Sequence, residues 1–140
     1  MSESVSPRSA SVGDVLAPFA RTTGLDNWNR YAAVNDEFVD IHMDDAAGRA
    51  AGYPSAFGMG NLQWSYLHSL LRGWLGDEGR IVRVACSFRA PNLKHQTVTA
   101  RGVVTEVREE QGRRVIELDV WTEDGDANQI APGSATVELG

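Results

Sequence analysis

The hydrophobic pattern of the sequence changes its period near the middle of the chain, and this change most constrains the fold. Between residues 58 and 75, large apolar side chains recur every three or four residues, as on the buried face of a helix: Met59, Leu62, Tyr66, Leu67, Leu70, Leu71, Trp74 and Leu75. From Ile81 onward, apolar residues alternate with a period of two, which is typical of strands. This order predicts an α+β fold with an antiparallel sheet wrapped on a long helix.

Several strands are expected after this helix. The alternation that starts at Ile81 ends at the "APN" break of residues 90–92. Residues 97–109 and 113–124 are predicted as two strands joined by a hairpin at "EQG", and residues 133–140 as a last strand.

The segment before the long helix is predicted to be irregular with two short helices. One helix is expected in residues 25–36, capped by Asp26, and a second in residues 43–52, with Asp44 or Asp45 near its start. Residues 1–14 are rich in serine and too polar to pack, so we expect a flexible tail followed by one domain over residues 15–140.

Composition excludes several classes of function. The chain carries 13 basic and 19 acidic residues in scattered positions, for a net charge of −6, which argues against a nucleic-acid partner. The single cysteine, Cys86, can form neither an intrachain disulfide nor a thiolate metal site. The N-terminal residues lack an apolar stretch as long as the core of a signal peptide, and no apolar stretch in the chain is long enough for a membrane span. We therefore expect a cytoplasmic protein that is not in a membrane.

The stretch "NDEFVDIHMD", residues 35–44, contains candidate catalytic groups. Glu37 and His42 are five positions apart, and an irregular loop can turn both side chains toward one pocket. A carboxylate beside an imidazole can move protons near neutral pH because each group tunes the pKa of the other. Asp36 and Asp40 are alternatives for the acid. A solvated turn that happens to contain a histidine is the other interpretation.

The stretch "SAFGMGNLQ", residues 55–63, precedes and opens the long helix. Backbone N–H groups in the first turn of a helix have no partner inside it and carry the positive end of its dipole, so they can stabilise a developing oxyanion. Gly58 and Gly60 would permit close approach of a ligand. An ordinary glycine-containing turn is the alternative.

Taken together, these stretches resemble the MaoC-like dehydratases and (R)-specific enoyl-CoA hydratases, which have the hot-dog fold. The family hallmark is Tyr-Ala, two residues, Ser-Gly-Asp, one residue, Asn-Pro, one residue and His, then Ala-His-Gly-Met. The sequence "YAAVNDEFVDIH" aligns with the first part, placing Glu37 on the catalytic Asp and His42 on the catalytic His, and "AFGM" aligns Gly58 and Met59 with Gly-Met. The resemblance covers residues 15–139.

Departures from the hallmark indicate a divergent member. Asn35-Asp36 replaces Ser-Gly, Val39-Asp40 replaces Asn-Pro, and Phe57 replaces the His before Gly-Met. The catalytic Asp is lengthened to Glu37, and a misplacement of about 1 Å can cost on the order of a hundredfold in rate.

The resemblance implies reversible hydration of a 2-enoyl thioester, carried by CoA or acyl carrier protein, by a homodimer or a heterodimer of hot-dog subunits. Glu37 and His42 would hold the water, the Gly58 N–H would stabilise the enolate, and no metal or other cofactor would be needed. Five residues are expected to contact substrate: Phe57, Met59, Trp64, Arg89 and Lys94.

Three alternatives remain open. A hot-dog thioesterase typically has an acid on the central helix, but residues 58–75 contain none. The chain could be a non-catalytic partner subunit or acyl-binding module. It could also act on a bulky secondary-metabolite or steroid side-chain thioester instead of a linear chain.

Overall fold

A computed structural model describes residues 5–140 of the chain. Its strands are β1 (Phe19–Thr22), β2 (Gly79–Cys86), β3 (Thr97–Glu110), β4 (Arg113–Glu123) and β5 (Gln129–Leu139). Its α-helices are α1 (Leu25–Asn35), α2 (Asp45–Ala50) and α3 (Gly60–Leu75), and two short 3-10 turns are η1 (Pro7–Ser9) and η2 (Asp40–His42).

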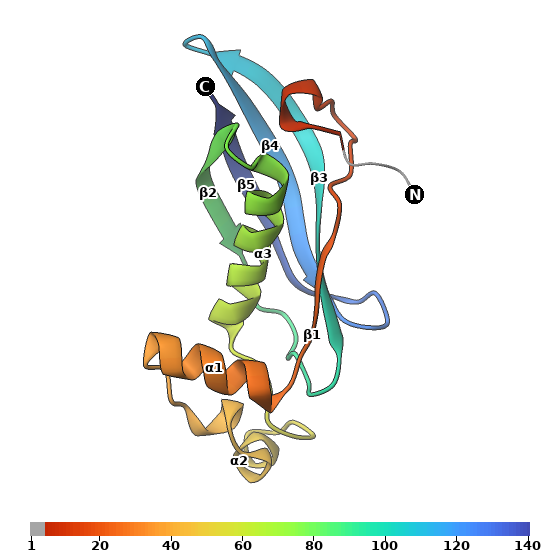
Figure 1. Cartoon of the computed structure of the whole chain (residues 1–140). Coiled ribbons are helices and arrows are strands. Elements are labelled where there is room, and N and C mark those ends of the chain that lie inside the picture. Colours follow the sequence, from red (N-terminus) through yellow and green to blue (C-terminus); the bar gives the residue numbers. More distant parts are fainter. Residues whose placement is uncertain (1–4) are drawn as a thin grey trace.

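The strands form one antiparallel sheet in the order β1-β3-β4-β5-β2. The sheet curls around α3, while α1 and α2 lie together beyond the amino end of α3 (Figure 1). The predicted α+β hot-dog architecture is therefore confirmed, and the helix predicted from residue 58 begins two residues later, at Gly60.

The hairpin predicted at "EQG" joins β3 to β4. Glu110 pairs with Arg113, which leaves Gln111 and Gly112 as a two-residue turn. Both have positive φ values, +51° and +76°, as the turns that match strand twist require.

The core has two parts. In the larger, the fully buried Leu67 and Leu71 of α3 pack with inward-facing residues of the sheet, including Ile116 and Val137. The smaller consists of four buried side chains at the α1 end of the molecule: Trp28, Ala32, Ala56 and Met59. This smaller cluster seats α1 against the turn that precedes α3.

The two short helices differ from expectation in detail. Helix α1 starts after Gly24, whose N–H donates to Asn27 Oδ1 at 2.9 Å, so the predicted cap at Asp26 is wrong. Val34, near the carboxyl end of α1, is 84% exposed. Helix α2 is capped as predicted, because Asp44 Oδ1 accepts the Ala46 N–H at 3.2 Å.

The N-terminal segment packs against the fold from residue 5 onward. Trp74 Nε1 donates to the Val5 carbonyl at 2.7 Å, and Arg114 donates to the Ala10 carbonyl at 2.6 Å. Ala10 is buried. The packed region thus starts earlier than the expected boundary at residue 15, and the rest of the predicted tail, residues 1–4, lies outside the described residues.

No helix within residues 5–140 is long and apolar enough to span a membrane.

Candidate active site

The loop between α1 and α2 turns His42 inward. Helix α1 ends when Asp36 adopts a left-handed conformation, with φ +54°, and the Ala32 carbonyl accepts the N–H groups of Asp36 and Glu37. The 3-10 turn η2 follows and buries His42, which is 9% exposed, while Asp36 and Asp40 remain exposed. The loop therefore presents one buried titratable side chain to the interior.

The imidazole of His42 is fixed by the turn before α3. Its Nδ1 atom lies 2.7 Å from the carbonyl oxygen of Phe57, and the Phe57 N–H donates to the Ile41 carbonyl at 3.1 Å. The two rings also pack edge to face, with centroids 5.3 Å apart. Because a carbonyl can only accept, Nδ1 carries a proton, so that the lone pair of the neutral form of the ring is on Nε2. His42 is thus arranged to accept a proton at Nε2.

A cavity of about 250 Å³ opens beside His42 at the amino end of α3. Its walls include aromatic and polar residues from three segments of the chain: His42, Tyr53, Phe57, Gly58, Gly60, Gln63, Phe88, Arg89, Ala90 and Pro91. The volume is just below the range of about 300–1,000 Å³ that encloses a drug-sized ligand. It is suited to the reacting end of a substrate and not to a whole thioester.

Glu37 is half-buried but does not line this cavity. It lies near Tyr31 of α1: burial raises the pKa of the Tyr31 hydroxyl, and the negative charge of Glu37 raises it further. The structure therefore brings His42 to the cavity without Glu37, and the convergence of the two side chains on one water stays a prediction.

The backbone of Gly58 is already engaged. Its N–H donates to the Asn92 carbonyl at 2.7 Å, so it is not free to bind a substrate oxygen as expected from the sequence. The sequence could not reveal this contact, because Asn92 belongs to a loop that lies far along the chain. Within residues 5–140, the Gly60 N–H has no backbone or side-chain acceptor, and Gly60 lines the cavity. Of the two glycines that line the cavity, the one with a free N–H is therefore Gly60, two residues after Gly58.

The predicted substrate contacts divide into two groups. Phe57 and Arg89 line the cavity, and Arg89 is exposed at its edge. Met59 is completely buried beside Trp28, so it cannot contact a ligand as expected. Trp64 is 40% exposed and donates to the Val84 carbonyl on β2, away from the cavity.

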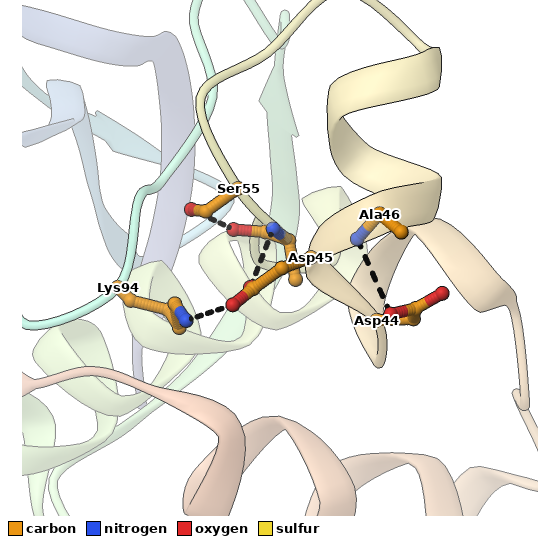
Figure 2. Close-up of polar contacts among 6 residues, drawn as sticks. Asp44, Asp45, Ala46, Ser55 and Lys94 are labelled. Carbon is orange, nitrogen blue, oxygen red and sulfur yellow. Dashed lines mark hydrogen bonds and ion pairs between the residues drawn. The ribbon is translucent and has the colours of Figure 1, made fainter.

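Lys94 forms a structural ion pair. Its Nζ atom lies 2.7 Å from Asp45 Oδ2, while Asp45 Oδ1 accepts the Ala56 N–H at 3.1 Å (Figure 2). These contacts join α2 and the loop after β2 to the turn that holds His42. Lys94 is therefore engaged in this pair and is a weaker candidate for contacting substrate than the resemblance implied.

Gln63 is a cavity residue that sequence reasoning missed. It lies on the buried face of α3, is 2% exposed, and its Oε1 accepts a 2.7 Å hydrogen bond from Thr122 Oγ1. The available signal was a single amide within an otherwise apolar helical face.

A second cavity, of about 580 Å³, lies at the other end of α3 under the N-terminal segment. Its lining is mainly apolar, with Phe19, Leu70 and Trp74 among its walls, and it contains no histidine. Within residues 5–140, no cluster of three or more His, Cys, Asp or Glu side chains could hold a metal ion. Of these two cavities, the one beside His42 is the one lined by a histidine.

Three solved structures resemble this one over nearly their whole length. The (R)-hydratase of A. caviae involved in PHA biosynthesis has a TM-score of 0.85 at 25% identity, covering 95% of this chain and 99% of that chain. A MaoC-like dehydratase from Rhodospirillum rubrum has a TM-score of 0.81 at 14% identity, covering 96% of each chain. The ChsH1–ChsH2 complex from Mycobacterium tuberculosis has a TM-score of 0.82 at 19% identity, covering 93% of this chain and 98% of the matched one.

The resemblance to MaoC-like dehydratases and (R)-hydratases predicted from the sequence is confirmed in structure, at sequence identities of 25% and 14%. No protein-family model and no curated protein sequence matches the chain.

Proposed function

We propose that the protein is a hot-dog hydratase that adds water to a 2-enoyl thioester, or removes it from a 3-hydroxyacyl thioester. The observation that carries the proposal is the hydrogen bonding and position of the His42 ring. Its Nδ1 proton is held by the Phe57 carbonyl, and its ring lines a cavity at the amino end of α3. A neutral imidazole with a free Nε2 atom is suited to take a proton from water.

In the hydration direction, His42 Nε2 accepts one proton from a water while the water oxygen bonds to the β carbon. The electrons of the carbon–carbon double bond move toward the thioester, and its carbonyl becomes an enolate. The α carbon then takes a proton, which restores the carbonyl. The Gly60 N–H, at the positive end of α3, is positioned to stabilise the enolate oxygen.

Glu37 is proposed as the acid partner of His42. Its half-buried position near Tyr31 requires the side chain to turn toward the cavity when substrate binds, because it does not line the cavity here. Glu37 would then help to hold the attacking water, and the proton that His42 takes from this water would pass to the α carbon.

We propose that a second hot-dog subunit pairs along β2. This strand is an edge of the sheet, and apolar side chains lie exposed around it, including Val82 at 48% and Trp64 at 40%. Pairing would cover both the open backbone edge and this apolar surface. The partner is an identical chain or a related one. The substrate would be carried by CoA or acyl carrier protein, with Arg89 near the mouth of the cavity as a candidate phosphate ligand.

The test is to incubate the purified protein with crotonyl-CoA and with longer and bulkier enoyl thioesters, and to follow loss of the enoyl absorbance. We expect turnover with at least one substrate, and loss of turnover in folded His42→Ala and Glu37→Gln variants. Activity that survives in His42→Ala would contradict the proposal.

A second candidate function is a non-catalytic partner subunit, and the position of Glu37 outside the cavity favours it. In that case the isolated chain turns over no thioester, and turnover requires a related hot-dog subunit that supplies the catalytic groups. Absence of turnover in the mixture as well would support an acyl-binding module.

A further inference from the structure

Gln63 is an unusual residue for its position. It lies on the buried face of α3, only 2% exposed, between the fully buried Met59 and Leu67. Burial of an amide costs free energy unless its polar atoms are hydrogen-bonded, typically about 1–3 kcal/mol in mutational data. The side chain therefore needs either partners within the fold or a ligand.

Only one half of this amide has a partner. Oε1 accepts the hydroxyl proton of Thr122 at 2.7 Å, and Thr122, on β4, is completely buried. This hydrogen bond fixes the plane of the amide. Within residues 5–140, Gln63 Nε2 donates to no acceptor, while Gln63 lines the His42 cavity. A fixed amide N–H2 group is thus available to a molecule in that cavity.

The cavity needs such a donor if it stabilises an enolate. Two glycines line the cavity at the start of α3. The Gly58 N–H is already bonded to the Asn92 carbonyl, so of these two glycines Gly60 alone can donate its N–H to a ligand. Oxyanion sites generally use two or more fixed donors, and removal of one costs on the order of 10²–10³ in kcat. Gln63 is three residues after Gly60 and hence on the same side of the helix.

We infer that Gln63 is a catalytic residue whose Nε2–H donates to the thioester carbonyl oxygen of the substrate and stabilises the enolate, with Thr122 as the positioning residue that holds the amide. This inference rests on the proposed hydratase function. As the hydroxyl group bonds to the β carbon, the electron pair of the double bond delocalises onto the carbonyl oxygen, where Gln63 binds it. When the α carbon is protonated, the pair returns and the carbonyl is restored.

The alternative is a purely structural hydrogen bond between Gln63 and Thr122, and two substitutions at position 63 separate these roles. Gln63→Met conserves volume but removes both polar atoms. Gln63→Glu keeps an acceptor for Thr122 and replaces the donor with a carboxyl group. We expect both variants to lose about 10²–10³ in kcat at neutral pH, with a much smaller change in KM. The ion-pair residue Arg108, on β3 and outside the cavity, provides the control Arg108→Met, which should leave kcat unchanged.

The pH profile gives a signature that a structural role would not produce. A carboxylate at position 63 repels an enolate, but a protonated carboxyl can donate to it. The kcat ratio of Gln63→Glu to wild type should therefore rise as the pH falls. The ionisable groups that line the same cavity are His42, Tyr53 and Arg89, and all three are present in both proteins, so the comparison is made as a ratio at each pH.

The hydroxyl of Thr122 is tested separately. Thr122→Val should lower kcat because the amide is no longer oriented, and Thr122→Ser should restore it. Binding of unreactive butyryl-CoA should also shift the thioester carbonyl stretch of the wild-type complex to lower wavenumber, and the shift should shrink in Gln63→Met. If Gln63→Met does not fold, the proposed role of Gln63 is tested by the pH dependence of kcat in Gln63→Glu and by the variants Thr122→Val and Thr122→Ser.

The outcomes distinguish this inference from the proposed function. A wild-type protein that turns over no thioester refutes the proposed function. If the wild-type protein is active, and a folded Gln63→Met or Gln63→Glu variant has a kcat within about threefold of it at neutral pH, the proposed role of Gln63 is refuted. The proposed hydratase function is not affected by that result.

Discussion

His42 Nδ1 and the Phe57 carbonyl oxygen are 2.7 Å apart, although the two residues are 15 positions apart in the sequence. This hydrogen bond joins the loop after α1 to the turn before α3, and it decides which imidazole nitrogen can act as a base. The bond therefore has both a structural and a chemical role, and substitution can separate them.

His42→Asn should preserve the structure but abolish the chemistry. The asparagine amide can still donate to the Phe57 carbonyl, but it has no basic nitrogen. We expect a melting temperature close to wild type and a loss of about 10²–10⁴ in kcat. His42→Ala should also lose stability, by about 1 kcal/mol, because the part-buried Phe57 carbonyl loses its donor. Substantial activity in the Asn variant would exclude His42 as the base.

Gly58→Ala should destabilise the fold. An added Cβ would lie 2.8 Å from both Asn92 Oδ1 and Trp28 Nε1, and Asn92 and Trp28 are almost completely buried. Overpacking of this kind typically costs about 1–3 kcal/mol. Gly73→Ala is the matched control, since nothing lies within 4 Å of its Cβ position in α3, and it should stabilise by about 0.5–1 kcal/mol. Urea denaturation measures both, and equal stabilities would contradict the packing seen at Gly58.

The Asp45–Lys94 pair should make stability dependent on acid pH. The hydrogen bond from Lys94, and then that from the Ala56 N–H, lower the pKa of the Asp45 carboxyl below its ordinary value of 3.8. The charged carboxylate therefore stabilises the folded state above that value, and this contribution is lost as the pH falls through the lowered pKa. We expect the stability of wild type to fall more steeply below about pH 4 than that of Asp45→Asn.

Lys94→Met supplies the control for this prediction. In the Lys94→Met variant, Asp45→Asn should lower the stability at neutral pH by less than it does in the wild-type protein, because the two residues are directly coupled. Denaturation midpoints measured from neutral pH to about pH 3 test both statements. Parallel curves for wild type and Asp45→Asn would show that the pair does not contribute.

Val82→Lys should disrupt the proposed dimer. Val82 is 48% exposed on the edge strand β2, where the register with β5 shifts, and a lysine on an edge strand opposes pairing with another chain. Light scattering should report the mass of a dimer for wild type and of a monomer for the variant. Val34→Lys, at a position 84% exposed on α1, should leave the mass unchanged. A monomeric wild type would refute the interface.

The sequence predicted the parts of the fold that repeat a pattern. The apolar periodicity of α3 and the alternation of β2 to β4 each extend over many residues, so single exceptions do not obscure them. Strand β1 was missed because it has four residues, three of them exposed, and hence no alternation to detect. The packing of residues 5–14 was missed because much of it consists of contacts to backbone carbonyls, such as that of Ala10.

The candidate site was predictable only where its residues are local in sequence. His42 and the turn at Gly58 were found from short motifs. The engagement of Gly58 by Asn92 and of Lys94 by Asp45 depends on loops that are distant in sequence, and no pattern records such pairings. Gln63 left a local signal, but its meaning depends on Thr122, 59 positions later.

The division of the core into two parts affects the order in which regions of the protein unfold. The small cluster around Trp28 and Ala56 contacts the main core through Leu62, while the sheet and most of α3 are stabilised without it. Mild denaturant should therefore release the α1–α2 region by local unfolding while the β-sheet persists. Loss of enzymatic activity would then precede loss of the sheet's circular dichroism, and the amide protons around Trp28 would exchange before those of the β-sheet.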